Sequence, residues 1–180
     1  GWSDAGCASP KPALIEAHGT GTALGDPIEV GALAAVVAGR REGELFALCG
    51  VKANLAHAES TAGLTGLLCL VFACSANARA PNAQLCALNP HLGSALQRML
   101  CALPTQLAAL AAPWSKELTV LSKELTLGGV SSFGYSGTIA HAVLQAEQGA
   151  QPLQLASPML PLKRRAFPWR DAVHPLLQQR

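Results

Sequence analysis

The chain twice follows an apolar run with a small-residue loop that carries a histidine, and then with a second apolar segment. The first run, residues 12–17, leads into His18 and a glycine-rich loop. The second run, residues 45–51, leads into a loop that ends at His57. Short apolar runs that end at glycines or polar loops are typical of buried strands. Strand, loop and helix therefore alternate twice, which predicts an α/β layered fold.

Two helices are expected in these units. A capping-box pattern predicts a helix from residue 26 to about 39: Asp26 would be the N-cap, Pro27 the first helical residue and Glu29 the third. A second, strongly apolar helix is expected over residues 60–78. Because a spanning helix needs ~20 predominantly apolar residues and this one is interrupted by Gly63 and Gly66, a buried core helix is favoured over a membrane span.

The remaining segments are less regular. Residues 81–112 mix proline, asparagine and histidine with apolar residues and predict only short elements that cross the surface. Residues 125–133 and 140–145 predict two strands around a tight turn at residues 134–138. Residues 151–180 contain five prolines and the basic cluster 163–165, so they are expected to form a linker or an arm lying over a neighbour.

Composition limits the classes of function. Half of the 180 residues are hydrophobic and 13% are charged, which predicts a deep core or a large interface. The net charge of +2 gives no case for nucleic acid. The histidines are far apart in sequence and no C-x-x-C pair occurs, so no metal site is predicted and reduced thiols are favoured over disulfides for the six cysteines, Cys7, Cys49, Cys69, Cys74, Cys86 and Cys101. The start at Gly1 rather than methionine, with no signal peptide, favours a fragment.

His18 and His57 both stand where a buried strand is expected to end, the position at which α/β folds display functional groups. A lone histidine there is more often structural, but two in equivalent positions of adjacent units favour a shared site. Lys52 lies five residues before His57, beside a buried strand end where its charge needs a partner. Glu59 is the candidate partner.

Three segments together resemble the motifs of type I β-ketoacyl synthases (ketosynthases). Residues 16–29 (EAHGTGTALGDPIE) resemble the first histidine motif, and residues 50–57 (GVKANLAH), continuing through Ala62 and Gly63, resemble the lysine and second histidine motif. Residues 129–141 (GVSSFGYSGTIAH) resemble the glycine-rich closing loop. By this resemblance residues 1–147 are identified as the C-terminal half of a ketosynthase domain of a polyketide or fatty acid synthase. The fold so implied is thiolase-like, a mixed β-sheet with helices on both faces.

The resemblance also implies a reaction, the decarboxylative Claisen condensation of a malonyl thioester with an acyl chain held on a cysteine. His18 and His57 would donate N–H groups to the malonyl thioester oxygen, where negative charge develops, and Lys52 would hold the surrounding polar network. Four further residues match substrate-contacting positions of the family: Thr20 and Thr22 at the pantetheine arm, and Phe133 and Gly134 at the acyl pocket and the site of the acyl oxygen.

Partners follow from the same resemblance. No cofactor is expected to bind directly, because the substrates are carried on the phosphopantetheine of an acyl carrier protein. That carrier, the N-terminal half of the ketosynthase and a second copy in a homodimer are the expected partners. The cytoplasm is the expected compartment, with a plastid left open. Residues 148–180 are expected to be an interdomain linker. Within them, residues 162–170 resemble the arginine- and aromatic-rich linker of modular synthases and are expected to pack back on the ketosynthase. Residues 174–177 resemble the start of their dehydratase domains, so residues 171–180 are expected to lead into another domain.

Departures from the family are expected to matter. Ala56 replaces a usual glycine and would be tolerated if its φ is negative, while Ile139 replaces a usual asparagine in a turn and would lose a hydrogen bond. No cysteine of this chain has the small-residue neighbourhood of the family's nucleophile, so the chain alone is expected to be inactive.

Other interpretations fit the sequence less well than a ketosynthase. Gly25 comes one residue too late after Gly19 and Gly21 for a dinucleotide-binding G-x-G-x-x-G motif. A hydrolase elbow at residues 134–138 fails because its fifth position is threonine. A non-catalytic docking or dimerisation module derived from a ketosynthase stays open, and a cysteine upstream in a small-residue turn would decide against it.

Overall fold

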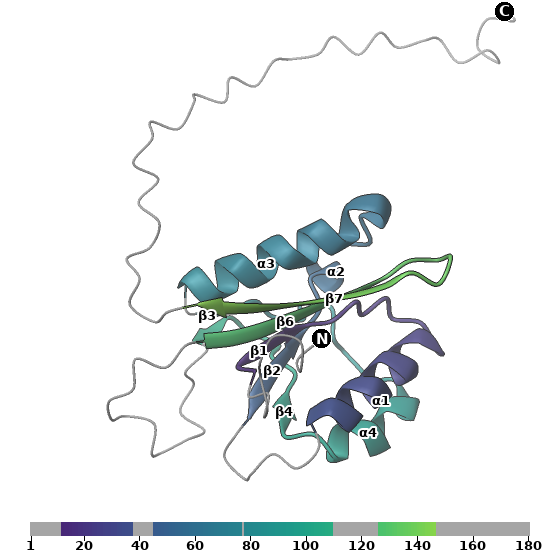
Figure 1. The fold of residues 1–180 in the computed structure, drawn as a ribbon. Coiled ribbons are helices and arrows are strands. Elements are labelled where there is room, and N and C mark those ends of the chain that lie inside the picture. Colours follow the sequence, from purple (N-terminus) through teal and green to yellow (C-terminus); the bar gives the residue numbers. More distant parts are fainter. Residues whose placement is uncertain (1–11, 38–44, 77, 110–125, 147–180) are drawn as a thin grey trace, which may run out of the picture.

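The computed structural model describes residues 12–37, 45–76, 78–109 and 126–146. Its strands and helices alternate along the first half of the chain, and a long hairpin closes the described part (Figure 1). In chain order the elements are β1 (Leu14–Glu16), α1 (Gly25–Val37), β2 (Phe46–Cys49), α2 (Lys52–Leu55), the 3₁₀ turn η1 (Glu59–Thr61), α3 (Ala62–Ala76), β3 (Ala78–Arg79), η2 (Pro90–Leu92), α4 (Gly93–Gln97), β4 (Cys101–Ala102), β5 (Ala108–Ala109), β6 (Thr126–Phe133) and β7 (Ile139–Ala146).

The central sheet has five strands in the order β4-β2-β1-β6-β7. β1 lies between β2 and β6 and runs parallel to both, β2 runs parallel to β4, and β6 pairs antiparallel with β7. β3 and β5 form a separate antiparallel pair. The expected mixed sheet and the hairpin around residues 134–138 are confirmed. His18 follows the end of β1 as expected, whereas the helix α2 lies between the end of β2 and His57.

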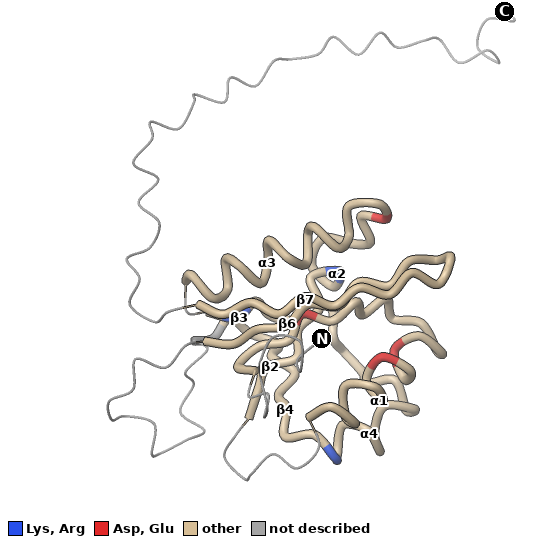
Figure 2. The backbone as a smooth tube through the Cα atoms, in the orientation of Figure 1, with Lys and Arg blue, Asp and Glu red and all other residues tan. Residues whose placement is uncertain are grey.

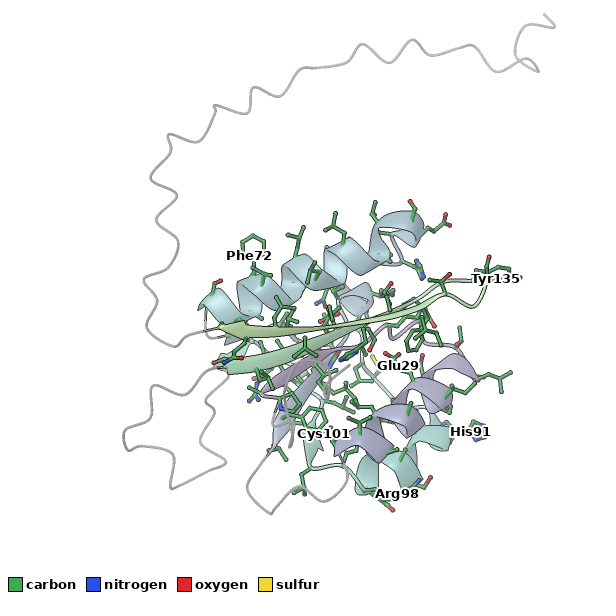
Figure 3. All side chains as sticks on the ribbon, viewed as in Figure 1. Glu29, Phe72, His91, Arg98, Cys101 and Tyr135 are labelled. Carbon is green, nitrogen blue, oxygen red and sulfur yellow. The ribbon has the colours of Figure 1, made fainter. Side chains whose placement is uncertain are left out.

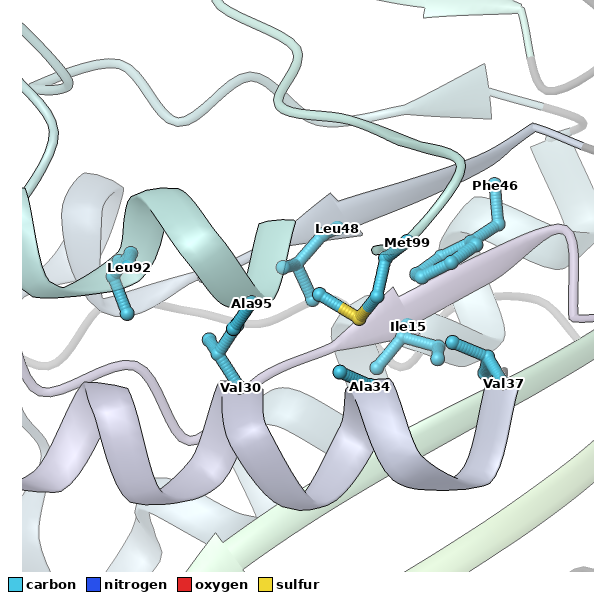
Figure 4. Close-up of a cluster of buried hydrophobic side chains, with 9 residues drawn as sticks. All are labelled: Ile15, Val30, Ala34, Val37, Phe46, Leu48, Leu92, Ala95 and Met99. Atoms are coloured by element: carbon cyan, nitrogen blue, oxygen red, sulfur yellow. The ribbon is translucent and has the colours of Figure 1, made fainter. Parts of the chain in front are cut away.

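Helices cover both faces of this sheet, as expected (Figure 1). Because successive side chains of a strand point to opposite faces, Ile15 faces α1 and α4 while Leu14 faces α3. The cluster between the sheet and α3 consists of Leu14, Ala47, Cys49, Leu70, Ala73 and Val130. The cluster between the sheet, α1 and α4 (Figure 4) consists of Ile15, Val30, Ala34, Val37, Phe46, Leu48, Leu92, Ala95 and Met99.

The prediction of a buried core helix holds for one face of α3 only. Ala62, Gly66, Leu70 and Ala73 are buried against the sheet, whereas Phe72 is 67% exposed and projects away from it (Figure 3). By length and composition alone, residues Glu59–Ala76 would also pass as a membrane-crossing helix. The packing of its small residues on β6 and β1 is that of a core helix with one uncovered side.

Two expectations need correction. Residues 81–112 do not simply cross the surface: Leu92, Ala95 and Met99 are buried in the core, because η2 and α4 pack on α1 and β4 joins the central sheet. The capping box is also wrong. Helix α1 begins at Gly25, whose N–H donates to Thr22 Oγ1 (3.0 Å), and Glu29 reaches outside the helix.

Candidate active site

The two histidines meet at one edge of the sheet. β1 and β2 are adjacent and parallel, so the loops that follow them lie side by side. His18 comes two residues after β1, and His57 follows the short helix α2 after β2. Their ring centroids are 5.8 Å apart, with the ring planes at 87°. The expected convergence of the two side chains, 39 positions apart in sequence, is present in the structure.

Hydrogen bonds fix the same tautomer in both imidazoles. The Phe133 backbone N–H donates to His18 Nδ1 (3.3 Å), and the Glu59 backbone N–H donates to His57 Nδ1 (2.8 Å). Since Nδ1 is the acceptor in each ring, the hydrogen of each neutral imidazole is on Nε2. Burial, reinforced by the nearby positive charge of Lys52, lowers the pKa of His18 and keeps it neutral at pH 7. The site therefore offers two N–H donors.

Two buried carboxylates hold the backbone of this site, and sequence analysis missed the role of both. Glu29 points from α1 toward the sheet (Figure 3) and accepts the N–H groups of His18 (2.7 Å) and Gly19 (2.9 Å). Glu16, 1% exposed, accepts the Val51 N–H (2.5 Å). For Glu16, the sequence offered one signal: the residue lies inside the apolar run 12–17, and a carboxylate buried with that run requires hydrogen-bond donors.

Glu16 and Glu29 act on the pKa of Lys52, rather than Glu59, the partner suggested from sequence. Burial lowers the pKa of Lys52, and the carboxylates of Glu16 and Glu29 oppose this shift. A basic position at α2 and acidic positions at the start of α1 can be followed along the backbone in Figure 2. Glu59 serves the site differently, through its backbone bond to His57. That Lys52 holds the polar network around the histidines stays a prediction.

Of the substrate-binding candidates, Phe133 contacts His18 directly. The Phe133 ring lies 5.2 Å from the His18 ring. Gly134 begins the hairpin turn, where its N–H donates to the Thr138 carbonyl (2.6 Å). The hydroxyl oxygens of Thr20 and Thr22 are 3.4 Å apart on an exposed loop, and Thr22 also caps α1. The contacts of all four residues with a substrate stay predictions.

The two family departures differ in their consequences. Ala56 has φ 65° and ψ −177°, so the negative φ that would make an alanine harmless is not present. This region of backbone conformation is essentially reserved for glycine. Ile139 does not sit inside the turn: it is the first residue of β7, 74% exposed and opposite Phe133, where a β-branched residue is favoured. Ala56 therefore stores strain next to His57, and Ile139 does not.

Of the five described cysteines, Cys49 is buried and Cys86 is exposed, while Cys69, Cys74 and Cys101 are half-buried. Cys49 Sγ donates to the Ala80 carbonyl (3.4 Å), and burial raises its pKa to about 12. Burial raises the pKa of Cys69 to about 11 and also raises those of Cys74 and Cys101. Within the described ranges no group of three or more His, Cys, Asp or Glu side chains could hold a metal ion. Cys7 lies outside the described residues.

Comparison with known proteins agrees with this geometry. Residues 2–85 match the family described as "Beta-ketoacyl synthase, C-terminal domain". The chain is 36% identical over 153 residues, 84% of its length, to a phenolphthiocerol/phthiocerol polyketide synthase of Mycobacterium tuberculosis. This chain belongs to the β-ketoacyl synthase family. A highly reducing polyketide synthase (frbB) of Dothideomycetidae sp. is 40% identical to it over 135 residues, 74% of this chain.

Solved ketosynthases show the same fold. The oxazolomycin ketosynthase domain of Streptomyces albus is 30% identical, with a TM-score of 0.67 over 81% of this chain. The ketosynthase from module 6 of the bacillaene synthase of Bacillus subtilis is 29% identical, with a TM-score of 0.67 over 82%. This chain spans 24% and 25% of the length of those two solved chains, and 8% and 5% of the length of the two curated relatives.

Proposed function

We propose that this chain forms the C-terminal half of a ketosynthase domain that catalyses decarboxylative condensation of a malonyl thioester with an acyl thioester in polyketide or fatty acid synthesis. The observation that carries the proposal is the pair of imidazoles, 5.8 Å apart, whose Nδ1 atoms both accept backbone N–H groups. Two Nε2–H donors held side by side suit an oxyanion, and one missing donor in such a site typically costs about 10²–10³ in rate.

The proposed chemistry uses these donors in the first step. The bond between C2 and the carboxylate carbon of the malonyl group breaks, CO₂ leaves, and the electron pair forms an enolate whose charge lies on the thioester oxygen. His18 and His57 donate to that oxygen. The enolate carbon then attacks the carbonyl of the acyl-cysteine, a C–C bond forms, and the cysteine leaves as a thiolate.

The nucleophilic cysteine is proposed to come from the N-terminal half of the domain. The buried thiol of Cys49 and the half-buried thiol of Cys69, with pKa values raised to about 12 and about 11, are unsuited to attack at neutral pH. The 180-residue chain by itself is therefore expected to accept no acyl group. Its contribution is the decarboxylation site.

The outer face of α3 is the proposed contact for that N-terminal half. Leu64, Leu68 and Phe72 are 58%, 48% and 67% exposed, and beside them Leu55 and Leu107 line a shallow cavity of about 480 Å³. An apolar face of this kind marks an interface. This chain covers only about a quarter of the solved ketosynthase chains, so we propose that the rest of the domain covers the outer face of α3.

Co-purification of the two halves, expressed as separate polypeptides, tests this contact. Phe72→Asp is expected to abolish co-purification. Val36→Asp also replaces an exposed apolar side chain by aspartate, at a position 47% exposed on α1, and should leave co-purification intact. If both variants co-purify with the N-terminal half equally well, the proposed contact at the outer face of α3 is contradicted. Self-association of this half without the other would instead assign the face to a second copy.

An acyl carrier protein is the proposed source of the malonyl group, presented on phosphopantetheine. The Thr20 and Thr22 hydroxyls on the exposed loop after His18 are the proposed hydrogen-bond partners of its amides. Residues 148–180, outside the described residues, are proposed to be an interdomain linker because of their prolines and basic cluster. A homodimer of the complete domain in the cytoplasm completes the proposal.

Release of labelled CO₂ from a malonyl thioester by the intact protein tests the function. His57→Ala is expected to lower this release about 10²–10³-fold while acyl transfer to the cysteine continues. His91→Ala, an exposed histidine on η2, serves as the control and should have no effect. CO₂ release at the wild-type rate in His57→Ala would contradict the proposal. An intact wild type that releases no CO₂ would favour the non-catalytic docking or dimerisation module instead.

A further inference from the structure

Glu16 is a buried carboxyl at the junction of the two histidine-bearing loops. It is the last residue of β1 and is 1% exposed, on the face of the sheet that α3 covers. Gly66 of α3 makes room for it: a Cβ at position 66 would lie 3.4 Å from Glu16 Cγ and 3.2 Å from Val130 Cγ2. The sequence thus provides a specific space for this side chain under an apolar helix.

The carboxyl links β1 to the loop that follows β2. The strand ladder itself ends with the bond from the Ala17 N–H to the Cys49 carbonyl (2.8 Å). Beyond that point the Val51 N–H donates to Glu16 Oε1 (2.5 Å), between residues 35 positions apart in sequence. Through this bond, the end of the His18 strand holds the start of the segment that carries Lys52 and His57.

The contact is transmitted to His57 through one turn of helix. The Val51 carbonyl accepts the N–H groups of Asn54 (2.9 Å) and Leu55 (3.0 Å), and the Lys52 carbonyl accepts that of Ala56 (3.0 Å). His57 is the next residue. A displacement of Val51 therefore moves the whole turn, and with it the position of the His57 ring relative to His18.

Other contacts keep this segment folded without Glu16. Asn82 accepts the Gly50 N–H (2.8 Å) and donates to the Leu48 carbonyl (3.1 Å), and Asn54 donates to the Pro81 carbonyl (2.9 Å). These bonds attach the loop to residues 81–82, on its other side. Loss of the Glu16 bond is thus expected to shift the segment rather than to unfold it.

We propose that Glu16 is a positioning residue, which sets the separation of the His18 and His57 rings by holding the Val51 N–H. Glu29 of α1 holds the His18 loop in the same way, because its carboxylate accepts the N–H groups of His18 and Gly19. This inference rests on the proposed decarboxylation, and adds to it how the two donors are kept together.

The test compares the two half-reactions in the intact protein. In Glu16→Ala, kcat for release of labelled CO₂ is expected to fall about 10- to 100-fold, because misplacement of a catalytic group by ~1 Å can cost about 10²-fold. The KM for the malonyl thioester and the rate of acyl transfer to the cysteine should not change. Glu16→Gln should stay within about threefold of wild type, since the amide oxygen accepts the same hydrogen bond. Glu16→Asp, with a shorter side chain, should behave like the alanine variant, and it provides a second test if Glu16→Ala does not fold.

Leu70→Ala is the matched control, because it also removes a buried side chain between α3 and the sheet but touches neither histidine loop. It should lower the melting temperature and leave the ratio of the two half-reactions unchanged. A Glu16→Ala variant that behaves like this control, or like wild type, would overturn the positioning role alone. A wild type that releases no CO₂ would overturn the proposed function and this inference together.

Discussion

Replacing Ala56 by glycine should stabilise the protein, although glycine is usually the more costly residue. Ala56 has φ 65° and ψ −177°, and a non-glycine residue held in this region costs about 1–3 kcal/mol. Its side chain is exposed, so removal of the methyl group leaves no cavity. The larger entropy of glycine in the unfolded chain costs about 0.4–1 kcal/mol. The net gain in the free energy of unfolding is then about 0.5–2 kcal/mol.

Thermal unfolding of the intact protein measures this effect, with an expected rise in Tm of about 1–5 °C. Ala58→Gly is the matched control: it makes the same chemical change two residues away, at φ −81° and ψ 18°, where alanine carries no strain. That variant should lose about 0.4–1 kcal/mol. If both variants lower Tm by the same amount, the reasoning from backbone strain at Ala56 is refuted.

Two further predictions concern the layer between α3 and the sheet. A Cβ at Gly128 would lie 2.7 Å from Leu70 Cδ1, so Gly128→Ala should overpack this layer and cost about 1–3 kcal/mol in a denaturant titration, and an unchanged unfolding midpoint would contradict the packing. Burial raises the pKa of Glu16 from 4.5 to about 7, so the folded protein holds this proton while the unfolded chain releases it, and stability falls as pH rises through that window. Glu16→Gln should lack this loss: its Tm relative to wild type should increase between pH 4.5 and about 7, and a constant difference would contradict the raised pKa.

Much of the fold could be predicted because the signals are local. The apolar runs at residues 12–17 and 45–51 end in glycine or polar loops, and both are strands in the structure. The hairpin was visible as two strand-like segments around a small-residue turn. Residues 81–109 were not predictable, since η2, α4 and β4 are short and their place in the core depends on distant partners in α1 and β2.

The site could be predicted only for its side chains with evident chemistry. His18 and His57 were found from their equivalent positions after two strands, and the parallel pairing of β1 with β2 explains why they meet. The carboxylates were missed because their partners are backbone N–H groups up to 35 positions away, which no local pattern reveals. Glu29 was assigned to a capping box because its spacing fits both roles.

The most direct test of the two-histidine site is a crystal structure of the intact protein with a malonyl thioester analogue that cannot lose CO₂. We predict that the carbonyl oxygen corresponding to the thioester lies within about 3 Å of Nε2 of both His18 and His57. Both Nδ1 atoms should keep their bonds from the Phe133 and Glu59 N–H groups. An analogue oxygen bound by neither ring, or imidazoles whose Nδ1 atoms face the ligand, would contradict the role proposed for the two histidines.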